Sequence, residues 1–497
     1  MSLNDRRGPL TPSPGDPGFQ AAQIEDSSSP FSRPGTKLHL LTLSYGTIVF
    51  AITALAMAIH GFDGDVLMDV NIGQWILTHG HIPLHNYFTQ AGYGRPFSDT
   101  EWAFTVLVAW AYSWGGRLGV YLSLLPFLLI TAGFVGAWAA RARQGLLVVI
   151  VAAVGLTITS HPRPQLISYA AFALGLWAIQ QARRGRWTAL LVFLVAIVPW
   201  TNVHSSVVLA PLLLANEAVW NGPSVRYRGA MSAAALTSAL LMLIRFGGAD
   251  SGGRFIAHVF SSGVANVMSE WQSPNFHYLT GQAILPAVIV AWVLILPRLW
   301  RARAWATAAW VFLGPLATLW AIRFAPYMIL GVVAAAPLCW PRGESSRSTG
   351  WRAVVLLAGG ISALWAASLT QPTFFMNKSP VAAETYLARH HARNVLAYYD
   401  WGSSAEFAGL HPWVNGQAQL WASSRWWMPM IRAQNSVPDI MLWAQRWDPH
   451  TQWILWPLSP GIPVQPLAHQ LGWQLVQRTT SLSGPVGIWH RVPPTGP

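Results

Sequence analysis

The chain has 497 residues, of which 53% are hydrophobic and only 10% are charged, whereas an ordinary soluble protein has roughly 25% charged residues. This composition argues against a water-soluble enzyme and favours a membrane protein. The formal net charge of +13 does not indicate a nucleic-acid partner, because the basic residues form no concentrated basic face and instead follow membrane orientation. The single cysteine, Cys339, excludes an internal disulfide and a cysteine-based metal cluster.

Residues 1–37 are predicted to be a disordered cytoplasmic tail, since they are rich in Pro, Ser and Gly and have no apolar periodicity. A first apolar segment follows from about 38 to 59. It is too long and too far from the N-terminus for a cleaved signal peptide. We therefore interpret it as a signal anchor.

Residues 38–370 are predicted to form an all-α polytopic membrane domain of about eleven transmembrane helices. The pattern that predicts them is a series of apolar runs of about 15 to 20 residues separated by short loops that carry arginine. After the anchor, the candidate spans are 117–139, 145–159, 165–182, 187–201, 203–220, 230–246, 280–297, 305–321, 324–340 and 353–369.

The basic residues decide between two topologies. If the apolar segment 101–116 does not cross the membrane, 17 of the 23 basic residues before residue 370 fall on the cytoplasmic side, as the positive-inside rule requires. The segment is therefore predicted to be juxtamembrane. In this topology the first outer loop, residues 60–116, and residues 371–497 are extracytoplasmic, in a multi-pass protein of the cell inner or plasma membrane.

Residues 371–497 are predicted to be a small α/β domain. The composition becomes mixed polar and aromatic, and the β-like runs QWILWPL and GIWHRV occur together with turn signals. A helical stretch is expected at about 381–397.

The first outer loop contains five of the nine acidic residues between Lys37 and Thr370. Asp65 and Asp69 are four residues apart, so they share one face if the stretch is helical. Paired carboxylates suit a general base or a metal site. The simpler interpretation is that acids in an outer loop are only solvated.

Three further signals lie at predicted outer ends of spans. Arg163 is bracketed by Pro162 and Pro164, which fix a turn. Asn202 and His204 follow Trp200 at another boundary, and Arg323 lies between two spans with almost no loop. An isolated guanidinium there needs an anion or a carbonyl partner, although snorkelling to lipid headgroups explains it equally well.

Glu270 and Trp271 form a pair that suits sugar recognition, because an indole packs on a pyranose ring and a carboxylate accepts hydrogen bonds from hydroxyls. Trp is also common in interfacial belts. The chain has fifteen histidines, but His79, His81, His390 and His391 lack the spacing of a zinc motif. No structural metal site is therefore predicted.

The loop pattern resembles the GT-C superfamily of polyprenol-dependent glycosyltransferases, with the layout of protein mannosyltransferases and aminoarabinose transferases. The residues that carry the resemblance are Asp63-Gly64-Asp65, Asp69, Gly73-Gln74-Trp75-Ile76-Leu77, Gly80, Ile82-Pro83, Phe88-Thr89, Gly94-Arg95-Pro96, Glu101-Trp102, Arg163-Pro164-Gln165, Asn202, His204, Glu270-Trp271, Ser273-Pro274, Arg323 and Tyr399-Asp400-Trp401-Gly402.

The resemblance implies inverting transfer of a sugar from a polyprenyl-phosphate donor to an acceptor at the extracytoplasmic face. Asp65 is expected to be the general base, with Asp69 as the second candidate and Glu101 as the second loop acid. Arg163, Arg323 and His204 are expected to bind the donor phosphate. Asn202, Glu270 and Trp271 are expected to bind substrate. The chain departs from relatives at Asp69, where they often have His, at Asn86, where they have Asp, and at Asn415-Gly416-Gln417, where they have Asp-Gly-Arg.

Two other functions stay open from the sequence. One is a non-catalytic protein of the same fold that binds polyprenyl lipid or a cell-envelope partner, and the other is a transporter or flippase. No charged residue lies near the middle of a predicted span, which disfavours ion-coupled transport. The sugar, the acceptor and a requirement for a divalent cation are not fixed by the sequence, and no other cofactor and no nucleic acid are expected.

Overall fold

The computed structural model describes residues 36–62, 64–97, 99–157, 159–220, 224–243, 271–277, 279–341, 379–417, 420–421, 424–458, 464–481 and 484–492. Several predictions lie outside these residues. They are the disordered tail up to residue 35, the predicted span 353–369 and the candidate substrate-binding residue Glu270.

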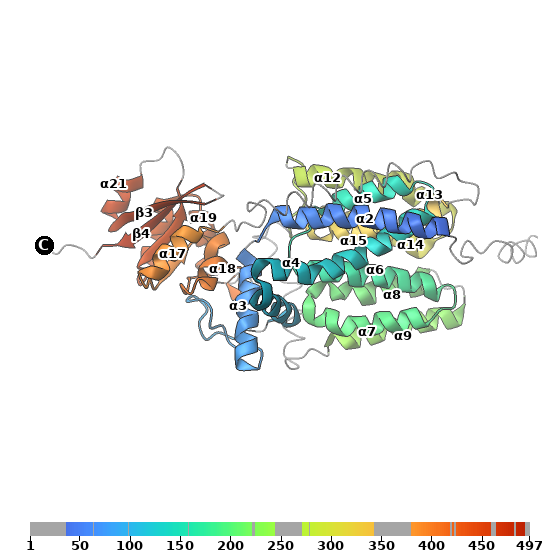
Figure 1. Cartoon of the computed structure of the whole chain (residues 1–497), viewed down its shortest axis with the longest axis horizontal. Coiled ribbons are helices and arrows are strands. Elements are labelled where there is room, and N and C mark those ends of the chain that lie inside the picture. The colour runs from blue at the N-terminus through green and yellow to red at the C-terminus, as the bar shows by residue number, and fades with distance from the viewer. Residues whose placement is uncertain are drawn as a thin grey trace, which may run out of the picture.

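Most of the described helices run lengthwise side by side in one bundle (Figure 1). Their apolar side chains pack in a single buried cluster that extends from Leu41 to Ala336. The lengthwise helices are α2 (Thr36–His60), the second part of α4 (Trp102–Arg141), α5 (Gly145–Thr157), α6 (Gln165–Ala182), α7 (Thr188–Val203), α8 (Leu209–Trp220), α9 (Val225–Leu243), α12 (Leu279–Ile289), α13 (Leu296–Arg301), α14 (Trp305–Trp320) and α15 (Ala325–Cys339).

Shorter helical turns complete the bundle. A π-helical segment, η3 (Val290–Ile295), joins α12 to α13. The 3₁₀ turns η1 (Ser205–Val208) and η4 (Ile322–Phe324) precede α8 and α15. Both 3₁₀ turns follow a residue with extended backbone, His204 and Ala321, so the chain reverses sharply where candidate site residues lie.

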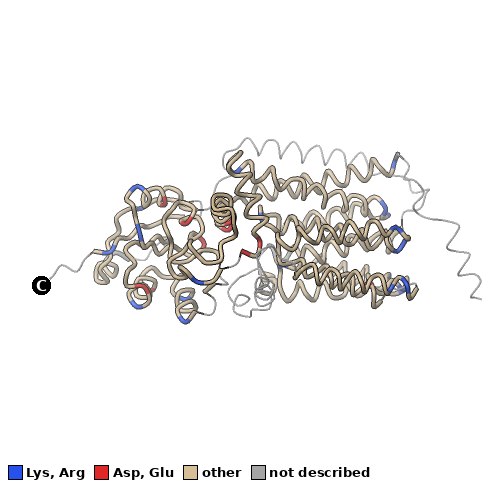
Figure 2. The backbone as a smooth tube through the Cα atoms, turned by 90° about the horizontal axis from the view of Figure 1, so that it is seen from below, with Lys and Arg blue, Asp and Glu red and all other residues tan. Residues whose placement is uncertain are grey.

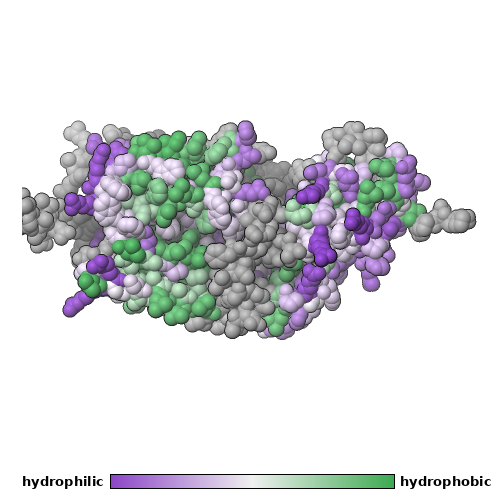
Figure 3. Space-filling view, turned by 180° about the vertical axis from the view of Figure 1, so that it is seen from behind, coloured by the Kyte–Doolittle hydropathy of each residue, from purple (hydrophilic) through white to green (hydrophobic). Residues whose placement is uncertain are grey.

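The bundle is built for a lipid environment. In the described part of the chain, four helical segments are long and apolar enough to cross a membrane, namely Lys37–Ile59, Trp102–Arg141, Ile284–Arg301 and Ile322–Cys339. Shorter apolar helices lie at Gly145–Thr157, Thr188–Val203, Ser205–Trp220 and Trp305–Trp320. Large apolar side chains such as Val195, Val293 and Leu129 are more than half exposed on the helix surfaces, and apolar surface covers the middle of the bundle (Figure 3). Such a surface is compatible with a lipid environment.

Helix α3 (Gly64–His79) lies across one end of the bundle, nearly at right angles to the other helices (Figure 1). It packs closely on the first part of α4, because Gly73 lies against the backbone carbonyl of Thr105 and any side chain there would overlap it. Within α4 the helical geometry is interrupted at Gly115 and at Gly116, which has a φ of 56°. Glycine adopts this conformation without steric cost. The kink separates 102–114 from the predicted span at 117–139.

The C-terminal region, residues 379–492, contains the sheet of the described structure. Four strands have the order β1-β2-β4-β3, with β1 parallel to β2 and the other pairs antiparallel. The strands are β1 (Val395–Ala397), β2 (Trp453–Pro457), β3 (Trp473–Ser481) and β4 (Gly484–Arg491). The helices are α17 (Val381–Arg389), α18 (Tyr399–Phe407), α19 (Trp427–Ala433), α20 (Val437–Trp447) and α21 (Val464–Gln470).

The helix predicted at about 381–397 is shorter in the structure. It ends at Arg389, and His391 and Asn394 have φ values of 49° and 54°. Left-handed backbone cannot continue a right-handed helix, so the chain turns there and enters β1.

The charged residues divide the bundle into two different ends. Lys and Arg gather at the end far from the sheet, and acidic residues lie at the end beside it (Figure 2). The first is called the basic end, where Arg143 N–H donates to Trp340 O and the Arg298 guanidinium lies 5.1 Å from the centroid of the Trp340 ring. The second is called the acidic end and contains Asp65, Asp69, Asp99 and Glu101.

Candidate functional site

The acidic end brings together residues that are far apart in the sequence, and each lies where a helix begins or ends. Asp65 is in the first turn of α3, and Glu101 is the residue that precedes α4. Arg163 precedes α6, His204 ends α7, and Arg323 lies in η4. The starts of α3, α4 and α6 therefore lie at this end together with the end of α7.

Asp65 and Arg163 form an ion pair. Arg163 Nη2 lies 2.7 Å from Asp65 Oδ2, and the side chains are 27% and 40% exposed for Arg163 and Asp65, respectively. Both groups are therefore accessible to a ligand. A partly exposed pair of this kind contributes little to stability, about 0–1 kcal/mol.

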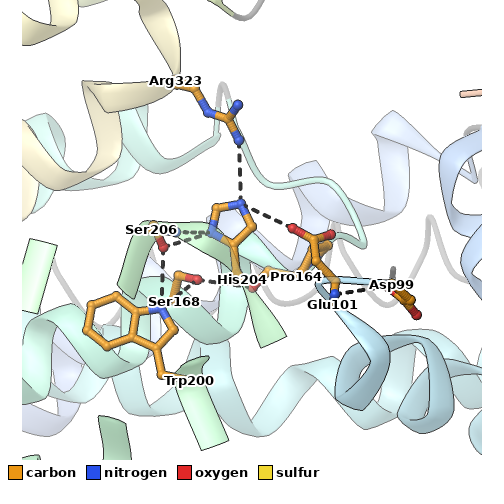
Figure 4. A network of polar contacts seen from close by, with 8 residues as sticks. All are labelled: Asp99, Glu101, Pro164, Ser168, Trp200, His204, Ser206 and Arg323. Carbon is orange, nitrogen blue, oxygen red and sulfur yellow. Dashed lines mark hydrogen bonds and ion pairs between the residues drawn. The ribbon is translucent and has the colours of Figure 1, made fainter. Parts of the chain in front are cut away.

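Glu101, His204 and Arg323 form a second chain of polar contacts (Figure 4). Glu101 Oε1 lies 3.8 Å from His204 Nε2, and Arg323 Nη2 lies 3.4 Å from the same nitrogen. The Arg323 guanidinium also lies 4.1 Å from the centroid of the Trp271 ring, within the range of a cation–π interaction. The chain thus places a second guanidinium at the acidic end.

Residues of α6, α7 and η1 orient the His204 ring on the side of its Nδ1 atom. Its Nδ1 accepts a hydrogen bond from Ser206 N–H at 3.2 Å and lies 2.7 Å from Ser206 Oγ. Trp200 Nε1–H donates to Ser168 Oγ and Ser206 Oγ at 3.0 and 3.3 Å. The other ring nitrogen, Nε2, faces Glu101 and Arg323.

The other predicted residues have different surroundings. Asp69 is buried, with 7% of its surface exposed. Asn202 Oδ1 accepts from Trp102 Nε1–H at 2.9 Å, and its Nδ2 donates to Val198 O. These bonds join α7 to the start of α4. Asp99 accepts from Glu101 N–H and from Thr105 Oγ1–H, which fixes the first turn of α4.

The sequence did not point to Ser168 or to the contacts that the C-terminal region makes with α3. Asn71 of α3 donates to Glu406 Oε1 of α18, and Asn415 donates to Glu406 Oε2, each at 2.6 Å. Asn71 and Glu406 are 335 positions apart. A local pattern cannot relate residues at that separation, so only the three-dimensional fold reveals the pair.

Two buried carboxyls of the C-terminal region have altered acidity. Burial raises the pKa of Glu384 to about 7, opposed by the hydrogen bond from Ser404 Oγ–H. Burial likewise raises the pKa of Glu406 to about 7, opposed by the hydrogen bonds from Asn415 and Asn71. Both side chains are less than 10% exposed, so the protonated form is favoured in the folded protein up to neutral pH.

These shifts predict a pH dependence of stability. A carboxyl group whose folded-state pKa lies above its unfolded value stabilises the folded protein fully below about pH 4. This stabilisation is lost as the pH rises through 7, at about 3 kcal/mol per carboxyl. Glu384→Gln combined with Glu406→Gln should flatten this dependence between pH 5 and pH 8. The measurement is the unfolding temperature from tryptophan fluorescence. An equal slope in wild type and double variant would contradict the assignment.

Among the residues that the structure describes, no group of three His, Cys, Asp or Glu side chains is placed to hold a metal ion. A hollow lies near the basic end, lined by Gln180, Arg183, Asn216, Glu217 and mostly apolar side chains of α6, α8, α14 and α15. Arg183 is held there by Glu217, with Nε and Nη2 at 2.7 and 2.6 Å from the two carboxylate oxygens.

The acidic end therefore combines an accessible carboxylate, two guanidinium groups and an oriented imidazole. This set can hold an anion and accept a proton. No protein-family model matches the chain, and no curated protein matches it.

Proposed function

We propose that the chain is a membrane glycosyltransferase of the GT-C type. It transfers a sugar from a polyprenyl-phosphate donor to an acceptor at the acidic end of the bundle. The observation that carries the proposal is the Asp65–Arg163 ion pair at 2.7 Å, with both groups accessible. In this proposal Asp65 is the proton acceptor, and Arg163, which precedes α6, binds the phosphate.

The proposed reaction begins when the donor phosphate replaces Asp65 as the partner of Arg163. The donor phosphate binds the Arg163 guanidinium bidentately and displaces the Asp65 carboxylate. Asp65 then accepts the proton of the acceptor hydroxyl as that oxygen bonds to the anomeric carbon. The bond from the anomeric carbon to the phosphate oxygen breaks, and its electron pair leaves on the polyprenyl phosphate, whose charge is stabilised by Arg163 and Arg323.

The polar chain of Glu101, His204 and Arg323 supports the same step. His204 Nε2 lies 3.4 Å from Arg323 Nη2 and 3.8 Å from Glu101 Oε1, and the Trp271 ring lies against the Arg323 guanidinium. A cation held in this way loses little conformational freedom when a phosphate binds. Glu101 is assigned to this positioning role, and Asp69 is the alternative base to Asp65.

The proposed topology has eleven spans, a cytoplasmic N-terminus and an extracytoplasmic acidic end in the cell inner or plasma membrane. The gathering of Lys and Arg at the basic end (Figure 2) supports this orientation. In a Cys339→Ser background, Tyr93→Cys should react with an impermeant thiol reagent added outside, and Gln144→Cys should not. Both residues are exposed on the protein. Labelling of the two from the same side would overturn the topology.

The test of the function is transfer by the purified full chain in liposomes. Polyprenyl-phosphate sugars labelled in the lipid are supplied together with a membrane fraction as the acceptor source, with and without EDTA. Release of free polyprenyl phosphate that depends on the acceptor fraction is the expected result, and the EDTA arm decides whether a divalent cation is required. Binding of polyprenyl phosphate without release from any donor would favour the non-catalytic lipid-binding alternative. Movement of intact donor between leaflets would favour a flippase.

A further inference from the structure

The C-terminal region contacts α3 at two levels along the helix. At the first level the carboxyl group of Glu406 joins Asn71 of α3 to Asn415, with both amide nitrogens at 2.6 Å from its oxygens. Glu406 and Asn415 are buried, with 6% and 0% of their surfaces exposed. These three residues are called the Glu406 clasp.

The second level is Asp65 itself. A methyl group at Gly416 would overlap Asp65 Oδ1, so the backbone of Gly416 lies directly against the carboxylate. Gly416 N–H donates to Ser403 Oγ at 2.8 Å. A methyl group at Gly64 would come within 2.9 Å of Asp400 O. The C-terminal region therefore forms one wall of the space in which the Asp65 side chain lies.

The two levels are connected through Asn415 and Gly416, which are neighbours in the chain. Asn415 Oδ1 accepts from Gln417 N–H at 3.0 Å, and its Nδ2 is held by Glu406. Glu406 thus fixes the turn that places Gly416. Along α3, Asn71 follows Asp65 by six residues, or about 9 Å of helix, so the clasp also fixes the direction of α3 relative to that turn.

We infer that the C-terminal region is a positioning element for Asp65 and that Glu406 is its positioning residue. This inference rests on the proposed role of Asp65 as the base. A general base has to be held within a fraction of an ångström of its productive position. The clasp provides that restraint from a segment far away in the sequence and without contact between Glu406 and the substrate.

The test is a reciprocal exchange. Asn71→Asp sets two carboxylates against each other and should open the clasp at pH 8, with a loss of at least about 10-fold in kcat and less than about 3-fold change in the donor KM. Adding Glu406→Gln should restore kcat, because the new amide donates to the new carboxylate and its oxygen still accepts from Asn415. Adding Glu384→Gln should restore nothing. Glu384 is the matched control, since it is also buried but bonds to Ser404 within the C-terminal region.

A second readout does not depend on activity. Hydrogen exchange of the backbone amides of Gly64–His79 should accelerate at least about 10-fold in Asn71→Asp, return to the wild-type rate with Glu406→Gln, and stay fast with Glu384→Gln. If wild type shows no transfer, the proposed function fails while the exchange data still decide the clasp. Unchanged exchange in Asn71→Asp, or equal rescue by both Glu substitutions, would overturn the inference.

Gly416→Ala is an independent variant for the case in which Asn71→Asp does not insert into the membrane. The added methyl group should displace the Asp65 carboxylate and lower kcat at least about 10-fold, with the donor KM retained. Gly133→Ala is its control, because no atom lies within 4 Å of a methyl group at that position. A Gly416→Ala variant with wild-type kcat would show that this wall does not position Asp65.

Discussion

Asp65→Asn is expected to lower the rate of sugar transfer at least about 100-fold, because a positioned general base typically contributes 10²–10⁴-fold. Asparagine has nearly the same shape and keeps an oxygen that can accept from Arg163, so insertion and folding should be unchanged. Binding of polyprenyl phosphate should become tighter, since the phosphate no longer competes with a carboxylate for Arg163. Transfer is measured in liposomes, and binding is measured by native mass spectrometry.

The control is Asp439→Asn, which changes an acid in the first turn of α20, in the C-terminal region and with no described contact to Asp65. It should transfer at the wild-type rate. Asp69→Asn distinguishes the two candidate bases, because Asp69 is buried on the same helix. Wild-type rates in both Asp65→Asn and Asp69→Asn would remove the carboxylates of α3 from the mechanism.

Arg163→Gln is the second variant with a large expected effect. Loss of a bidentate guanidinium–phosphate contact should lower kcat/KM for the donor by about 10- to 100-fold or more, since hydrogen bonds to charged groups each contribute about 1.5–3 kcal/mol. Arg163→Lys keeps the charge but loses the planar fork, so its rate should be intermediate. Steady-state kinetics at varied donor concentration measure both effects.

Arg143→Gln is the matched control for Arg163. Arg143 is exposed at the basic end of the bundle, so its loss should leave donor kinetics unchanged. Arg323→Gln should resemble Arg163→Gln if both guanidinium groups stabilise the leaving phosphate. An Arg163→Gln variant with the wild-type kcat/KM would place the phosphate elsewhere.

The helices of the bundle could be predicted from the sequence because apolar runs bounded by polar loops determine them locally. The predicted segment 165–182 coincides with α6, and 305–321 differs from α14 by one residue. The number of spans does not follow from local pattern, since four helical segments in the described part of the chain are long and apolar enough to cross on their own. The helix expected at 381–397 was too long because left-handed residues at 391 and 394 have no clear apolar signature.

For the candidate site, too, features that depend on local sequence could be predicted, and contacts between distant segments could not. We predicted from composition and from the ends of the apolar runs that Asp65, Arg163 and Arg323 share one end of the bundle. The structure places Asp65 in contact with Arg163. The contacts of Glu406 with Asn71 and of Gly416 with Asp65 could not be predicted. They depend on how the C-terminal region packs on α3. The types and spacing of residues along the chain do not indicate this packing.

The most direct measurement is a structure of the full chain in lipid with bound polyprenyl phosphate. The expected result is a phosphate group within hydrogen-bond distance of Arg163 and Arg323, with the Asp65–Arg163 contact of 2.7 Å broken and the carboxylate facing the space beside the phosphate. A phosphate bound at the basic end, or one bound while Asp65 stays paired with Arg163, would contradict the proposed exchange of partners.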